Sequence, residues 1–213
     1  MRELGFDAEI TGHWDLELDS QNVVLSGDDV SVEIEGERLS AKQGVLTFTD
    51  KRLASIELLG NTKFVGKFFP FQADHALYKT GSEPSEFSRV FNEVTMTGSV
   101  VSETKEPGEV ILFSANEVTL NSTGTILKGD AQFKIEIENA KTSENFKAIG
   151  SMDFGSMTYD IDSIKLSGNV NLMLEKGALK ETWQSDAITY RHDSGLTVDG
   201  ETFDIEKYFT DQQ

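Results

Sequence analysis

Three histidines, His13, His75 and His192, are the side chains best suited to bind a metal ion or move a proton near neutral pH. None has a second histidine or a cysteine at the spacing of a zinc site, and the chain contains no cysteine. No serine lies in the Gly-x-Ser-x-Gly turn of a serine hydrolase, and no phosphate-binding loop is present. The sequence therefore predicts structural histidines, no metal, no cofactor and no enzymatic activity.

Carboxylates are plentiful, but their spacing favours a solvated surface over catalysis. Asp15, Glu17 and Asp19 alternate along the chain, so in a strand they would share one face. A glycosidase needs two carboxyl groups across a cleft in unequal environments, whereas a row of like charges is typical of a face in water. The aspartates of segments 28–29 and 160–162 lack the spaced oxygen ligands of a calcium loop.

The net charge of −18, from 37 acids and 19 bases, argues against a nucleic-acid-binding protein, which needs a basic surface. The longest apolar run, Val110–Phe113, has four residues, so no membrane-spanning segment is predicted. Residues 1–30 show no apolar signal-peptide core, which predicts a cytosolic chain or one whose leader has been removed. Residues 1–40 hold 11 acids and 2 bases. This excess favours solubility, and the alternative is an acidic end that docks a basic partner.

The elements that must position these residues are strands. Apolar and polar residues alternate over Trp14–Asp19, Val30–Ile34 and Phe133–Ile137, and 18 glycines separate such runs. Only the segment 87–94 also fits a helix, and it fits a strand equally well. The sequence predicts an all-β fold with antiparallel sheet, in a single domain over residues 1–213 with disordered ends at 1–6 and 209–213.

Two short motifs alternate along these strands. The first centres on a glycine followed by a polar residue, and its copies are spaced 33, 38, 31, 39 and 32 residues apart, at Gly27, Gly60, Gly98, Gly129, Gly168 and, more weakly, Gly200. The second runs aromatic, polar, small, Asp or Asn, any, apolar, any, Leu or Tyr, at Phe71–Tyr78, Phe113–Leu120 and Trp183–Tyr190. The pattern predicts strand–turn–strand repeats of about 31–39 residues, with strands of about six to eight residues and a tight turn at each Asp or Asn.

The alternation of these motifs resembles the OstA-like (LptA/LptC-like) family of periplasmic lipopolysaccharide-transport proteins. The clearest matches are Leu166–Leu172, Phe71–Tyr78 and Trp183–Tyr190, and the repeat covers roughly residues 20–205. The chain is longer than the bridge proteins of that family usually are. The resemblance implies a periplasmic, open β-jellyroll ("β-taco") whose apolar groove shields the acyl chains of lipopolysaccharide or a similar lipid. It also implies pairing with other bridge components through edge strands, here around Ala8–Leu18 and Leu196–Ile205.

The apolar residues that follow the glycines are the candidate lining of such a groove. Those that share a strand face are Val30, Val32, Ile34, Phe64, Phe133, Ile135, Ile137, Val170, Leu172 and Leu174. In an ordinary β-sandwich the same residues would form the core. Two other functions stay open: a secreted carbohydrate-binding or adhesive β-sandwich, which exposed and coplanar Trp14 and Trp183 would support, and a hydrolase, which would need histidines and carboxylates converging in a cleft.

Overall fold

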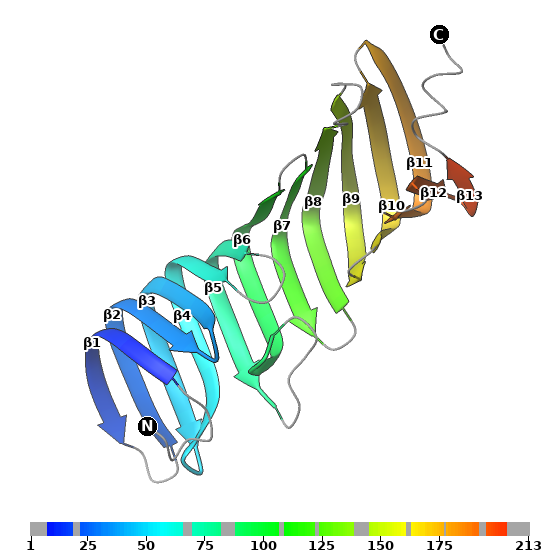
Figure 1. The fold of residues 1–213 in the computed structure, drawn as a ribbon. Helices are drawn as coiled ribbons and strands as arrows, with labels where there is room; N and C mark the ends of the chain where they lie inside the picture. The colour runs from blue at the N-terminus through cyan, green and yellow to red at the C-terminus, as the bar shows by residue number, and fades with distance from the viewer. Residues whose placement is uncertain are drawn as a thin grey trace. The chain divides into compact units, whose positions relative to one another are not determined.

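The computed structural model describes residues 8–18, 22–65, 70–81, 88–106, 109–121, 124–138, 145–160, 163–176, 178–191 and 195–203. Every regular element in these ranges is a β-strand and none is a helix, which confirms the all-β prediction (Figure 1). Phe91–Val94, which also fitted a helix, belong to a strand, while Phe87 lies outside the described residues.

The strands are long and follow one another in order. They are β1 (Ala8–Leu18), β2 (Asn22–Ile34), β3 (Glu37–Thr49), β4 (Arg52–Val65), β5 (Pro70–Thr80), β6 (Phe91–Glu106), β7 (Glu109–Asn121), β8 (Gly124–Glu138), β9 (Asn145–Asp160), β10 (Ser163–Lys176), β11 (Leu179–Arg191), β12 (Gly195–Val198) and β13 (Glu201–Phe203). Each strand neighbours the next one along the chain, and the described pairs are antiparallel.

The chain divides into two compact units. Unit 1 comprises Met1–Val101 and Glu117–Ser122, and unit 2 comprises Ser102–Asn116 and Thr123–Gln213. The division passes through β6 and β7. The predicted disordered ends at 1–6 and 209–213 lie outside the described residues.

The glycine motif recurs in every second strand, but as a bend inside the strand. In β4, Gly60 and Asn61 have φ values of +76° and +52°. Together they lie opposite the single residue Asp74 of β5, because Leu59 pairs with His75 and Thr62 with Ala73. Two residues against one is a β-bulge, which sharpens the local bend and twist.

Three further strands repeat this bend. The left-handed pairs are Gly98–Ser99 in β6, Gly129–Asp130 in β8 and Gly168–Asn169 in β10. Each of these strands is 14 to 16 residues long. The sequence-based prediction of a tight turn between strands of six to eight residues was therefore wrong at these positions. The first and last copies of the motif differ. In β2 the left-handed residue is Asp29 and not Gly27, and in the last copy Asp199–Gly200 forms the turn between β12 and β13.

The tight turns lie at the strand ends instead. Glu35–Gly36 joins β2 to β3 and Asp50–Lys51 joins β3 to β4, and all four residues have positive φ. Two-residue hairpin loops with both residues left-handed match the twist of the flanking strands. Glycine and Asx residues thus serve both the turns and the bends, because both require the left-handed conformation.

The two sequence motifs lie opposite each other in neighbouring strands, at the position of the bend. Asp74, from the second motif, lies opposite Gly60–Asn61, and Asp186 lies opposite Gly168–Asn169. A Cβ added to Gly98 would come within 2.6 Å of Asp74 Oδ2. The alternation of the motifs along the sequence therefore reflects strands that meet side by side at their bends.

The bends fold the sheet of unit 1 onto itself. Phe64 pairs with Phe71 on one side of the bend, and Tyr78 pairs with Ile56 on the other. Seven residues of straight strand between Phe71 and Tyr78 would span about 23 Å, yet the rings of Phe64 and Tyr78 have centroids 5.6 Å apart. The inner faces of the two halves are therefore in contact, as in a β-jellyroll, and the bending strands of unit 1 can be followed in blue and cyan in Figure 1.

Candidate functional site

The predicted groove residues whose side chains are described all point inward and are almost fully buried. Their exposed fractions are 0–2%, for Val30, Val32, Ile34 and Phe64 in unit 1 and for Phe133, Val170, Leu172 and Leu174 in unit 2. Ile135 and Ile137 lie in β8, but their side chains are outside the described ones. In unit 1, where the two halves of the folded sheet are in contact, a ligand would reach these residues only if the halves part.

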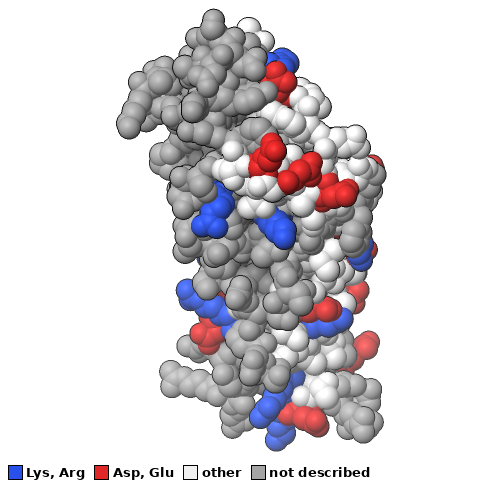
Figure 2. Space-filling model, turned by 90° about the vertical axis from the view of Figure 1, so that its right-hand side faces the viewer, with Lys and Arg blue, Asp and Glu red and all other residues white. Residues whose placement is uncertain are grey.

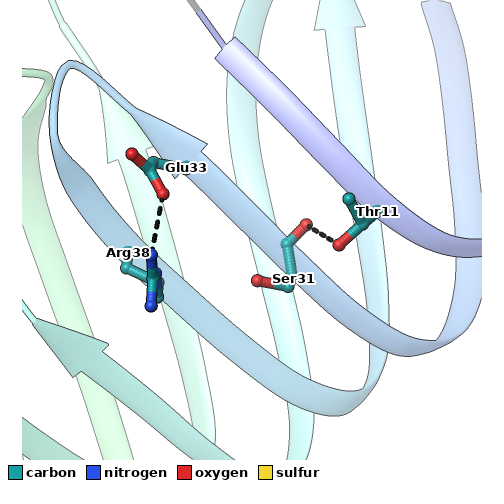
Figure 3. A network of polar contacts seen from close by, with 4 residues as sticks. All are labelled: Thr11, Ser31, Glu33 and Arg38. Carbon is teal, nitrogen blue, oxygen red and sulfur yellow. Dashed lines mark hydrogen bonds and ion pairs between the residues drawn. The ribbon is translucent and has the colours of Figure 1, made fainter.

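The outer face of β2 is polar. Ser31 and Glu33 alternate with the buried valines of β2, and Glu33 accepts a hydrogen bond from the exposed Arg38 at 3.1 Å (Figure 3). Thr11 of β1 donates to the carbonyl oxygen of Ser31 at 3.5 Å. On the face drawn in Figure 2, acidic and basic side chains are interspersed among the described residues.

An aromatic cluster occupies the interior of unit 1 where the halves meet. Tyr78 lies between Phe64 and Phe91, with ring centroids 5.6 Å and 5.2 Å away. All three rings are buried. The Tyr78 hydroxyl has no hydrogen-bond partner within the described residues. Burial raises the pKa of the phenol far above its ordinary value, so the group stays a neutral donor that lacks an acceptor.

A second buried polar feature is the Glu37 clasp, formed by Glu37, Ser88 and Arg89. Glu37 is only 2% exposed, although it is a carboxylate. Ser88 Oγ donates to its Oε2 at 2.6 Å, and the backbone N–H of Arg89 donates to its Oε1 at 2.5 Å. Ser88 Oγ in turn accepts from the backbone N–H groups of Val90 and Phe91, at 3.1 and 2.9 Å. The clasp therefore satisfies a buried carboxylate, which would otherwise be costly.

Sequence reasoning missed both features. Tyr78 appeared only as the last residue of a repeat motif, and Glu37 only as one acid of an acidic end. One signal was available: Glu37 lies two residues before Leu39, which is fully buried, so the alternation places the carboxylate on the inward face. Its partners lie 51 and 52 residues away, and no local pattern predicts them.

The residues considered for catalysis do not come together in the described part of the chain. His13 is exposed. The Nε2 atom of His75 is 3.0 Å from Glu57 Oε1, and its Nδ1 atom is 3.4 Å from Thr97 Oγ1. Asp15 and Glu17 are exposed on β1, whereas His192 and Asp19 are outside the described residues. No group of three or more His, Cys, Asp or Glu among the described residues could hold a metal ion.

The two tryptophans are half-buried. Trp14 packs against Gly27, where an added Cβ would come within 2.9 Å of the indole ring, and Trp183 lies on β11. They belong to different units.

Comparison with known proteins gives no relative: no protein-family model, curated protein or solved structure matches the chain. No helix in the described residues is long and apolar enough to cross a membrane. Any inference about function therefore rests on the sequence motifs of the chain and on the geometry and chemistry of its described residues.

Proposed function

We propose that this protein is a non-enzymatic, periplasmic lipid carrier of the OstA-like kind, which shields the acyl chains of lipopolysaccharide or a similar lipid during transport to the outer membrane. The observation that carries the proposal is the contact of Phe64 with Tyr78 across the bend. Because the sheet folds onto itself, its two apolar inner faces oppose each other. An acyl chain inserted between them would exchange one apolar contact for another.

Acyl chains, rather than headgroups, would provide the affinity. The net charge of −18 repels phosphorylated headgroups, while each buried methylene contributes roughly 0.8 kcal/mol. A chain of several methylenes therefore binds without any charged contact. Transfer would be passive, with its direction set by energy supplied elsewhere. No specific observation favours a carbohydrate-binding surface, since Trp14 packs against Gly27 rather than lying flat on a surface.

Lipid that stays with the purified protein tests the proposal. We expect native mass spectrometry after gentle extraction to show the chain with a bound lipid, and the lipid to be lost when the protein is unfolded in urea. Delipidated protein should then take up a fluorescent fatty acid. A chain that carries no lipid and takes up no fatty acid would contradict the proposed function.

Pairing with other components of a transport bridge would use the first strand. Among the described strands β1 has only β2 as a neighbour, and its Leu16 and Leu18 are 59% and 73% exposed. An unpaired edge is a template for another strand, and the exposed Asp15 and Glu17 favour a less acidic partner than a second copy of the chain.

Light scattering across ionic strength tests this preference. We expect a monomer at low salt, because like charges on the edge repel a second copy and only added salt screens them. Oligomers that form at low salt and persist on dilution would show that these charges do not control pairing.

A further inference from the structure

The folded sheet of unit 1 has two lips, because β3, β4 and β5 each continue on both sides of the bend. Leu39 of β3 pairs with Phe64 of β4, so the β2–β3 turn lies on the same side of the bend as the end of β4; we call this the first lip. Phe48 pairs with Leu53 beyond the bend, and Thr80 Oγ1 donates to the Leu53 carbonyl at 2.5 Å. The β3–β4 turn and the end of β5 therefore form the second lip.

The Glu37 clasp joins these two lips. Glu37 follows the β2–β3 turn directly and belongs to the first lip. Ser88 and Arg89 precede β6, whose start lies beside the end of β5, since Lys79 and Glu93 form an ion pair at 2.6 Å. Arg89 Nη1 also donates to the Glu35 carbonyl at 3.3 Å. The clasp thus joins the two lips through hydrogen bonds, whereas Phe64 and Phe91 in the interior are apolar.

The Tyr78 hydroxyl, which has no hydrogen-bond partner among the described residues, lies in this interior. Phe91 follows Ser88 by three residues, and its ring packs on Tyr78. A movement of the Ser88–Phe91 segment would therefore release the clasp and uncover Tyr78 in one step. A buried hydroxyl without a partner is costly, and a ligand that supplies an oxygen acceptor removes that cost.

We propose that unit 1 binds one acyl chain bearing an oxygen acceptor between Phe64, Tyr78 and Phe91, and that the chain enters sideways, between the lips, when the Glu37 clasp opens. The inference rests on the proposed function and adds to it an entry route and a ligand chemistry. The acyl chain occupies the contact between the two inner faces, and its ester, carboxyl or hydroxyl oxygen accepts the hydrogen of Tyr78.

Glu37→Gln tests the entry route. The carboxylate accepts from two donors, Ser88 O–H and Arg89 N–H, whereas glutamine offers one acceptor oxygen and a donor NH₂ group that opposes the second. Loss of about one hydrogen bond should make stopped-flow uptake of cis-parinaric acid roughly fivefold faster. Glu33→Gln is the matched control, because it removes the same charge from an exposed site on the same hairpin, and it should leave the rate unchanged.

A covalent cross-link between the two lips, called the lock, should have the opposite effect to Glu37→Gln, because it keeps the lips together. The chain has no cysteine, so Glu35→Cys with Arg89→Cys introduces the only two thiols, one on each lip at exposed positions. A short bismaleimide should then block uptake, while each single-cysteine variant treated with the same reagent cannot be cross-linked and should still take up the fatty acid. Uptake by Arg89→Cys should be no slower than wild type, because this variant only loses the hydrogen bond to the Glu35 carbonyl. Circular dichroism and urea unfolding confirm that each variant is folded.

Tyr78→Phe tests the ligand chemistry. It should weaken the binding of cis-parinaric acid about fivefold, by one hydrogen bond, and leave the binding of diphenylhexatriene, which has no oxygen, unchanged. Wild-type protein that binds neither probe overturns the proposed function itself. Binding with uptake rates that neither Glu37→Gln nor the lock alters overturns the entry route, and equal effects of Tyr78→Phe on both probes overturn the assigned acceptor.

Discussion

Phe133→Asp should prevent unit 2 from folding. Phe133 lies on β8 and is 1% exposed. Loss of a buried aromatic ring costs about 3–5 kcal/mol, and an unpaired carboxylate in its place adds several more. The sum is comparable with the about 5–15 kcal/mol that stabilises a typical domain. Because Phe133 is also a predicted groove residue of unit 2, a variant that does fold should lose lipid uptake in unit 2, whereas the acyl-chain site proposed in unit 1 should remain.

The two tryptophans allow the stability of unit 2 to be measured separately from that of unit 1. The chain has two, Trp14 in unit 1 and Trp183 in unit 2. In a Trp14→Phe background, the fluorescence of Trp183 during urea unfolding reports on unit 2. The neighbouring Gln132 is exposed, so Gln132→Asp adds the same charge outside the interior and should change stability by less than about 0.5 kcal/mol. A similar small effect of Phe133→Asp would show that Phe133 is not part of a packed interior.

Gly98→Ala should destabilise unit 1 by about 3 kcal/mol, of which the left-handed φ of +75° accounts for about 1–2 kcal/mol. Crowding accounts for the rest, because the new Cβ would lie 2.9 Å from the Asp74 Cβ, an atom that cannot move aside without its strand. The destabilisation should appear in urea unfolding followed by Trp14 fluorescence, in a Trp183→Phe background.

Gly200→Ala separates the two causes. Gly200 also has a left-handed φ, of +83°, but an added Cβ there would meet no atom within 4 Å. Its cost, read from Trp183 because Gly200 lies in unit 2, should be only the conformational part, about 1–2 kcal/mol. Equal costs for the two variants would contradict the close approach of Asp74 to the bend of β6.

The strands and the inward direction of their apolar residues were predictable from the sequence. Alternation with a period of two places Val30, Val32 and Ile34 on one face, and all three are buried. The prediction succeeds because successive side chains of a strand point to opposite faces of the sheet, whichever strand lies beside it. The position of the bends was not predictable in the same way: Gly60–Asn61 supplies the left-handed conformation that a hairpin turn and a mid-strand bulge both require. Which of the two forms depends on how the neighbouring strand pairs.

The sequence by itself therefore determined an acidic, all-β chain with apolar strand faces and a repeated pair of glycine and a polar residue. Only the tertiary structure decided that these pairs bend β4, β6, β8 and β10, and that the bend in unit 1 brings Phe64 against Tyr78. It also decided that Glu37 is a buried acceptor rather than one more surface acid. The physical reason is separation along the chain: Glu37 and Ser88 are 51 residues apart and meet only after the intervening strands have paired and folded over.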